Sequence, residues 1–166
     1  MRDPKGKLMT LEEALEWRRV VAEAGHLTAV TNGCFDLLHR GHVEYLNRAR
    51  AEADVLLVLV NTDASIEKVK GAGRPIVRQD DRVYMLASLE SVDGVVLFDT
   101  EHCTDLLEKL TPDVYVKGGD YTEETLVQEE FRLLKRMGCR IALLGFVDGM
   151  STTDIIRRIR EGEEKT

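Results

Sequence analysis

The sequence predicts a single α/β domain built on a doubly wound parallel sheet of five strands, with helices on both faces. Short β-rich segments alternate with helical segments along the chain, and this order requires crossover connections and therefore a parallel sheet. One β-rich segment, residues 55–60, is apolar at every position, as expected for a central strand covered on both sides. The length of 166 residues suits one domain with a substantial core.

The expected elements follow one another in order. A helix should start after Thr10, because Thr10 and Glu13 form a capping box, and it should stop at Gly25. The five strands are expected at residues 27–31, 55–60, 95–98, 114–116 and 141–144. The other helices are expected to begin near residue 41 and to span residues 80–89, 102–110, 123–137 and 152–160. The chain then divides into an N-terminal helix (1–26), the sheet domain (27–160) and a polar, frayed tail (161–166).

Composition excludes several classes of partner. The net charge of −7 argues against nucleic acid or an anionic membrane as a partner. No apolar run approaches the roughly 20 residues needed to cross a bilayer, and the N-terminus lacks the apolar stretch of a signal peptide. Three cysteines (Cys34, Cys103 and Cys139) share no metal-type spacing, which favours a reduced, cytoplasmic protein. A site for phosphorylated ligands must therefore supply positive charge locally.

The loop after the first strand carries the strongest functional signal. His39 and His42 lie three residues apart at the start of a helix, so both rings are expected on one face. Gly33 and Gly41 allow the backbone to approach a ligand closely, and the helix N-terminus adds partial positive charge. Two imidazoles, N–H groups and a helix dipole then converge on one anion-sized spot.

Cations follow two other strands. Lys68, Lys70 and Arg74 lie around two glycines after the second strand, and they predict a flexible loop that closes over triphosphate oxygens. Lys117 leaves the fourth strand beside Gly118, which predicts another cation within reach of phosphate.

Two further segments complete the expected ligand site. After the fifth strand, Ser151 or Thr152 caps a helix whose N-terminus can bind phosphate. Asp120, which follows the fourth strand, can accept a hydrogen bond from a sugar hydroxyl or cap the next helix.

Two of these segments carry a resemblance to a known family. Residues 33–42, Gly-Cys-Phe-Asp-Leu-Leu-His-Arg-Gly-His, resemble the signature of the HxGH nucleotidyltransferase superfamily, in particular its cytidylyltransferase-like branch. Residues 149–153, Gly-Met-Ser-Thr-Thr, resemble its second signature. The resemblance covers residues 27–159 and implies a Rossmann-like fold. It also implies that His39 and His42 stabilise charge on an α-phosphate, that Asp36 lies near the phosphates and that Arg82 contacts phosphate.

Five segments are similar, more narrowly, to the adenylyltransferase half of bifunctional heptose-phosphate enzymes: residues 31–36, 61–65, 73–75, 117–121 and 148–153. This implies transfer of AMP from ATP to D-glycero-β-D-manno-heptose 1-phosphate, a step toward the lipopolysaccharide core, with Mg²⁺ held mainly by the ATP phosphates rather than by a protein metal site. The sugar kinase half is absent, so a separate heptose kinase is expected upstream, and a homodimer is expected because the family commonly dimerises.

The resemblance also fixes the expected roles of the residues. The catalytic groups are His39, His42 and Lys117, and the phosphate loop is Lys68, Lys70 and Arg74. The expected nucleotide contacts are Thr31, Asn32, Gly33, Cys34, Phe35, Gly41, His42, Asp63, Arg74, Arg82, Gly118, Asp120, Phe146, Val147, Ser151, Thr152 and Thr153.

Other functions share part of this evidence. A cytidylyltransferase acting on glycerol 3-phosphate would keep the fold and both signatures. ATP is nevertheless favoured, since residues 146–148, Phe-Val-Asp, stand where a basic residue often precedes the glycine. A nucleotide sensor without activity would keep the fold as well. A dinucleotide-dependent redox protein is disfavoured because the first turn lacks Gly-x-Gly-x-x-Gly.

Overall fold

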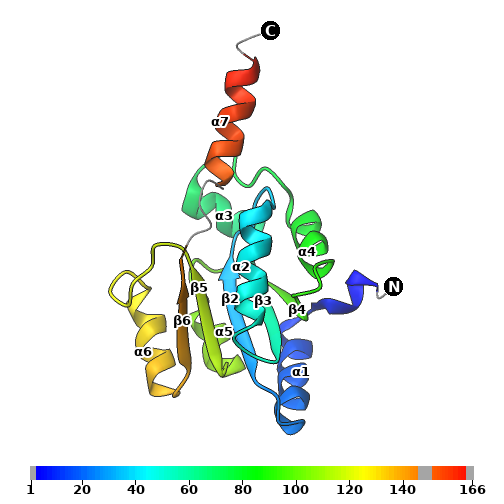
Figure 1. Ribbon diagram of the computed structural model, residues 1–166, viewed down its shortest axis with the longest axis vertical. Coiled ribbons are helices and arrows are strands. Elements are labelled where there is room, and N and C mark those ends of the chain that lie inside the picture. Colours follow the sequence, from blue (N-terminus) through cyan, green and yellow to red (C-terminus); the bar gives the residue numbers. More distant parts are fainter. Residues whose placement is uncertain (1–2, 146–150, 164–166) are drawn as a thin grey trace.

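A parallel sheet of six strands lies at the centre of the computed structural model, which describes residues 3–145 and 151–163 (Figure 1). The order across the sheet is β1-β4-β3-β2-β5-β6, and every neighbouring pair is parallel. The strands are β1 (Leu8–Met9), β2 (Thr28–Gly33), β3 (Val55–Asn61), β4 (Gly94–Phe98), β5 (Val114–Gly118) and β6 (Arg140–Leu144). All five expected strands are present within one or two residues of their predicted bounds.

Seven α-helices and one 3₁₀ helix accompany these strands within the described ranges. They are η1 (Pro4–Lys7), α1 (Leu11–Glu23), α2 (Arg40–Arg50), α3 (Asp63–Lys70), α4 (Gln79–Ala87), α5 (Thr104–Leu110), α6 (Gln128–Arg136) and α7 (Thr152–Glu163). The predicted capping box of α1 is confirmed, because Thr10 and Glu13 each accept the other's backbone N–H. No helix in these ranges is long and apolar enough to cross a membrane.

The expectation of five strands is wrong by one, because β1 joins the sheet at its edge. Leu8 and Met9 pair with Val95 and Val96 of β4. The Lys7 ammonium donates to the carbonyl of Leu89 at 2.8 Å, which fixes the approach of this segment. A strand of two residues is too short to show a period in the sequence, so only the following helix was expected there.

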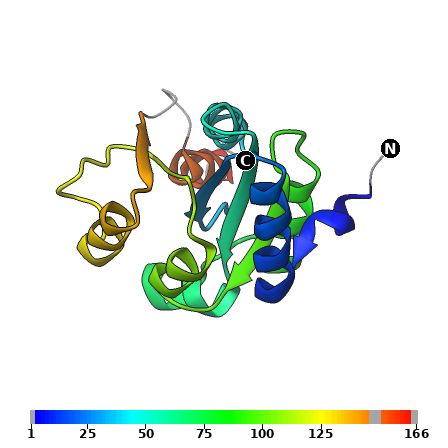
Figure 2. The same cartoon turned by 90° about the horizontal axis from the view of Figure 1, so that it is seen from below.

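Helices cover both faces of the sheet, as a doubly wound fold requires. On one face, α2 and α4 contribute Leu46 and Leu86 to a core cluster with β2, β3 and β5. On the other face, α1, α5 and α6 pack their apolar side chains against the same strands, for example Leu107 and Leu134. Figure 2 shows α2 and α6 on opposite sides of the sheet. The predicted fold class is therefore confirmed apart from the strand number.

Two expected local structures differ from those observed, and side-chain hydrogen bonds explain both. The unbroken helix expected at 123–137 begins only at Gln128, because Thr125 accepts from the backbone of Thr122 and the Gln128 amide donates to three preceding carbonyls. Lys68 and Lys70, expected in a flexible loop, instead lie in the last turn of α3, a helix whose first turn the Thr62 hydroxyl caps; the loop begins at Gly71.

The order of the strands reverses between β2 and β5. From β2 the chain crosses to β3 and β4 on one side, and it then returns to β5 and β6 on the other. In such folds a crevice opens beyond the carboxyl ends of the strands at the reversal. Helix α7 follows this edge and projects away from the sheet at the top of Figure 1; it continues to Glu163, past the expected end at 160.

Candidate active site

A cavity of about 530 Å³ lies at the carboxyl ends of the strands, where the strand order reverses. This volume is typical of small-molecule sites, which span roughly 300–1,000 Å³. Among the residues expected from the sequence, those that line it are Asn32, Gly33, Cys34, Phe35, Asp36, His39, Gly41, His42, Lys70, Lys117, Gly118, Ser151 and Thr152. The fold thus brings together the loops after β2, β5 and β6 and the end of α3.

The two histidines are stacked at the start of α2. Their ring centroids lie 3.9 Å apart with an interplanar angle of 24°. The backbone N–H of His39 donates to Nδ1 of His42 at 3.4 Å, so the neutral ring of His42 carries its proton on Nε2. Phe35 packs against the same ring, with centroids 5.6 Å apart. The ring of His42 is therefore held by a hydrogen bond and by two ring contacts, and that of His39 by stacking on His42.

Burial favours the neutral form of both histidines. Burial lowers the pKa of His42 to about 4, with a further contribution from nearby His39 and Lys70, which Asp36 opposes. Burial also lowers the pKa of His39. Neutral rings act as hydrogen-bond donors to an anion rather than as charges, so the positive charge in the pocket comes from Lys70 and Lys117.

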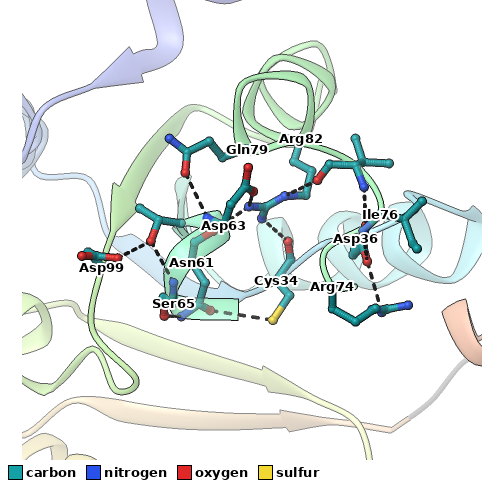
Figure 3. Close-up of polar contacts among 12 residues, drawn as sticks. Cys34, Asp36, Asn61, Asp63, Ser65, Arg74, Ile76, Gln79, Arg82 and Asp99 are labelled. Carbon is teal, nitrogen blue, oxygen red and sulfur yellow. Dashed lines mark hydrogen bonds and ion pairs between the residues drawn. The ribbon is translucent and has the colours of Figure 1, made fainter. Parts of the chain in front are cut away.

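Asp36 lines the pocket, and its carboxylate is also the anchor of a neighbouring segment. It is 3% exposed, accepts from the backbone N–H groups of Ile76 and Val77 at 3.0 and 2.9 Å, and pairs with Arg74 at 3.1 Å (Figure 3). Its neighbours Phe35 and Leu37 both adopt a φ of 48°, a conformation that costs about 1 kcal/mol or more for such residues. The contacts of Asp36 compensate for this strain.

Arg74 and Arg82, both expected to bind phosphate, do not line the pocket. Arg74 is paired with Asp36 instead. The Arg82 side chain is fully buried; it donates to the carbonyls of Val77, Cys34 and Asn61 and pairs with Asp63 (Figure 3). Four of the five N–H donors of this guanidinium are used within the protein, and the expected contact of Arg82 with phosphate stays a prediction.

Several other expected contacts lie elsewhere. Asp63 holds Arg82, and the Thr31 hydroxyl lies below the pocket, 2.6 Å from the hydroxyl of Tyr45. Lys68, Asp120 and Thr153 are exposed and do not line the cavity. Phe146 and Val147 fall outside the described residues.

Ser151 and Thr152 reach the pocket, but their hydroxyls are already used. Ser151 caps α7 by accepting from the backbone of Asp154 at 3.0 Å, as expected for a cap. The Thr152 hydroxyl donates to the carbonyl of Asp36 at 2.9 Å, which joins α7 to the loop that carries the histidines. Any phosphate here would meet the backbone N–H groups of the helix start rather than these hydroxyls.

Lys117 lies on the floor of the pocket at the end of β5. Its ammonium donates to Oδ1 of Asn32 at 2.6 Å and lies 5.3 Å from the ring centroid of Tyr121. Burial lowers the pKa of Lys117, and the nearby carboxylate of Glu130 opposes this shift. The next residue, Gly118, must be a glycine, because a Cβ at this position would overlap the ring of Tyr45, which also lines the pocket.

The sequence missed part of the lining: Tyr45, Asn61, Val69, Glu101, His102, Gly119, Tyr121, Val127, Glu130 and Gly145. Glu101 and His102 follow β4, so the rule that ligands lie beyond the strand ends could have found them. Glu130 lies on α6 and is 3% exposed; only the packing of that helix brings it to the pocket. Among the described residues, no group of three or more His, Cys, Asp or Glu side chains could hold a metal ion.

The pocket combines cationic side chains with helix N-termini, and it lies where the strand order of a doubly wound sheet reverses. These features place the chain in the class of nucleotide-binding α/β proteins. Within that class the chain belongs to the cytidylyltransferase-like family of nucleotidyltransferases, whose model matches residues 30–158.

Curated relatives are similar over almost the whole chain. It is 45% identical over 163 residues, 98% of its length, to the Bifunctional protein HldE of Geotalea uraniireducens (strain Rf4). It is 48% identical over 161 residues, 97% of its length, to the Bifunctional protein HldE of Methylococcus capsulatus (strain ATCC 33009 / NCIMB 11132 / Bath). The chain spans 33% and 34% of these two relatives, about a third of their length.

Two solved structures share the fold. The lipopolysaccharide core biosynthesis protein from Thermoplasma volcanium GSS1 has a TM-score of 0.60 and 23% identity, covering 74% of this chain and 98% of that one. The pantoate-beta-alanine ligase from Francisella tularensis, complexed with beta-gamma ATP and beta-alanine, has a TM-score of 0.62 and 13% identity, covering 92% of this chain and 76% of that one. At these identities the similarity shows the fold alone.

Replacing Arg82 should destabilise the fold. Arg82→Met leaves three carbonyls and the Asp63 carboxylate without their donor, and we expect the free energy of unfolding to fall by about 3 kcal/mol. Urea denaturation measures it. Arg78→Met is the matched control, because Arg78 is exposed and precedes the same helix. Equal stabilities of the two variants would contradict this structural role.

The depressed pKa of His42 predicts a dependence of stability on pH. The unfolded chain binds a proton on this ring near its ordinary pKa of 6.5, whereas the folded chain binds it only near 4. The free energy of unfolding should therefore fall as pH falls from about 6.5 to about 4. In His42→Gln the slope of the free energy of unfolding against pH should be smaller, by the amount that corresponds to about one bound proton. Urea titrations at several pH values across that range measure this slope. Equal slopes for the two proteins would show that the ring is not held neutral.

Proposed function

We propose that this protein is an adenylyltransferase that transfers AMP from ATP to D-glycero-β-D-manno-heptose 1-phosphate, giving ADP-heptose and pyrophosphate. The observation that carries the proposal is the stacked pair of neutral histidines at the start of α2, facing the same cavity as Lys117. The identity of 45–48% with proteins described as Bifunctional protein HldE supports the heptose phosphate acceptor. The Phe-Val-Asp segment at 146–148 favours ATP, because it lacks a basic residue before the glycine.

The reaction needs no general base. A phosphate oxygen of the acceptor, already ionised at neutral pH, attacks the α-phosphorus of ATP. The bond from that phosphorus to the oxygen bridging the α- and β-phosphates breaks, and pyrophosphate leaves. Catalysis then rests on positioning and on stabilising the charge of the transition state.

Each group has a role that its geometry allows. The Nε2–H of His42 and the ring of His39 donate to the α-phosphate oxygens, since both rings are neutral and fixed. Lys117 and Lys70 neutralise the acceptor phosphate and the departing pyrophosphate. The start of α7 offers backbone N–H groups to the remaining phosphate oxygens. Mg²⁺ enters with ATP and is held mainly by its phosphates.

The lining of the pocket leaves a place for the sugar. Glu101 and His102 follow β4, which lies two strands from β2 in the sheet, whereas the start of α7 contacts the loop after β2. Carboxylate and imidazole groups bind hydroxyls well, so this side suits the heptose ring. A heptose kinase outside this domain would supply the sugar phosphate. Both substrates are metabolites of the cytoplasm, where we place the reaction; the expected homodimer stays a prediction.

Pyrophosphate release tests the proposal directly. With Mg²⁺ present, ATP and CTP are each combined with the heptose 1-phosphate and with glycerol 3-phosphate. We expect turnover with ATP and the heptose phosphate alone. Turnover with CTP would overturn the assignment of the base, and turnover with glycerol 3-phosphate would overturn that of the acceptor. If the folded protein binds ATP but releases pyrophosphate with none of the four substrate pairs, the proposed activity is wrong.

His42→Ala should separate catalysis from binding. We expect kcat to fall about 100-fold, because one donor to the developing charge is lost. The dissociation constant for ATP, measured by calorimetry, should change only a few-fold. His26→Ala is the matched control, since His26 is exposed, does not line the pocket and precedes the amino end of β2, whereas the pocket lies at the carboxyl ends of the strands. Near-normal turnover of His42→Ala would refute the catalytic assignment.

A further inference from the structure

A chain of buried polar groups runs from the floor of the pocket to helix α6. The Lys117 ammonium donates to Oδ1 of Asn32 at 2.6 Å and lies 3.5 Å from the hydroxyl of Tyr115. That hydroxyl lies 2.8 Å from Oδ1 of Asn32 and 3.3 Å from Oε2 of Glu130. The other oxygen of Glu130 accepts from the backbone N–H of Cys103 at 2.8 Å and from its thiol at 3.3 Å.

The charges along this chain are unequal. Burial raises the pKa of the Cys103 thiol and of the Tyr115 hydroxyl far above their ordinary values, so both groups are neutral at physiological pH. The groups that face Lys117 are Asn32 and Cys34 from β2 and its loop, Tyr115 from β5, Tyr121 from the next loop, Cys103 before α5 and Glu130 from α6. Glu130 is the one carboxylate among them.

We propose that Glu130 is a positioning residue, whose buried carboxylate acts through the Tyr115 hydroxyl to keep the Lys117 ammonium charged and aimed into the pocket. Placing an ammonium in a poorly solvated site favours its neutral form, and a nearby carboxylate offsets that cost. Glu130 itself is 3% exposed and fixed by Cys103, so the countercharge cannot turn away to solvent.

The arrangement also explains how Lys117 can serve two partners. The hydroxyl of Tyr115 has one proton and two acceptors, Asn32 and Glu130. Oδ1 of Asn32 accepts from both the ammonium and the Tyr115 hydroxyl, so the hydroxyl can remain its donor when a phosphate draws the ammonium away. The amide oxygen then keeps a donor, and Glu130 remains close to the charge.

The role of Lys117 toward phosphate rests on the proposed function, but its charge state can be measured without any turnover. The protein is labelled with lysine carrying ¹³C at Cε, and the Lys117 signal is assigned from its loss in Lys117→Arg. Titration of that signal gives the pKa of Lys117. In Glu130→Gln, which keeps the shape of the side chain, we expect this pKa to fall by about one unit. Glu129→Gln, the exposed neighbour on the same helix, should leave it unchanged.

Kinetics and a second variant complete the test. The alkaline limb of kcat/KM against pH should move to lower pH in Glu130→Gln and stay in place in Glu129→Gln. Tyr115→Phe, which removes the relay and keeps the ring, should move it in the same direction. An unchanged Lys117 titration in folded Glu130→Gln would overturn the positioning role. If the titration shifts as expected while the wild-type protein releases no pyrophosphate, the proposed function fails and the positioning role stands.

Discussion

The buried guanidinium of Arg82 is the contact on which the geometry of the pocket depends. It draws together the end of β2 through Cys34, the end of β3 through Asn61 and the segment before α4 through Val77. A charge removed from water is costly unless it is paired and hydrogen-bonded, and here Asp63 and three carbonyls meet that requirement. Two strand ends are thereby held at a fixed separation, and the loop that carries the histidines starts from one of them.

Asp36 extends the same constraint toward the pocket. Arg82 and Asp36 both hold residue Val77, one at its carbonyl and the other at its N–H. The carbonyl of Asp36 in turn accepts from Thr152, which ties α7 to the loop after β2. Two parts of the pocket lining, separated by more than 100 residues in sequence, therefore share one network. A loop with two strained residues can keep one shape because it is held from both sides.

Much of this architecture could be predicted from the sequence, and the exceptions have a common physical cause. Apolar strands and helix caps are local patterns, so the five principal strands and the start of α1 were predictable. His39, His42 and Lys117 follow strand ends, and the rule for parallel sheets places them in one pocket. The acidic partners of Arg74 and Arg82 could not be predicted, because a sequence shows a cation but not the group that it pairs with. Their partners, Asp36 and Asp63, lie in other segments of the chain, and only the folded structure brings each pair together. Glu130 was invisible for the same reason, since its burial depends on how α6 packs.

The contacts between remote residues also decide which side chains supply positive charge to the pocket. The chain carries a net charge of −7, so a triphosphate is not attracted by the protein as a whole. The histidines are neutral, and two arginines that could have supplied charge are bound to Asp36 and Asp63. Lys117 and Lys70 remain as the cations of the pocket in the described part of the chain. Lys117 lies at the end of β5, which pairs with β2, the strand that precedes the histidine loop. A catalyst that depends on so few charges must keep each of them ionised, and a buried carboxylate one hydroxyl away provides the means.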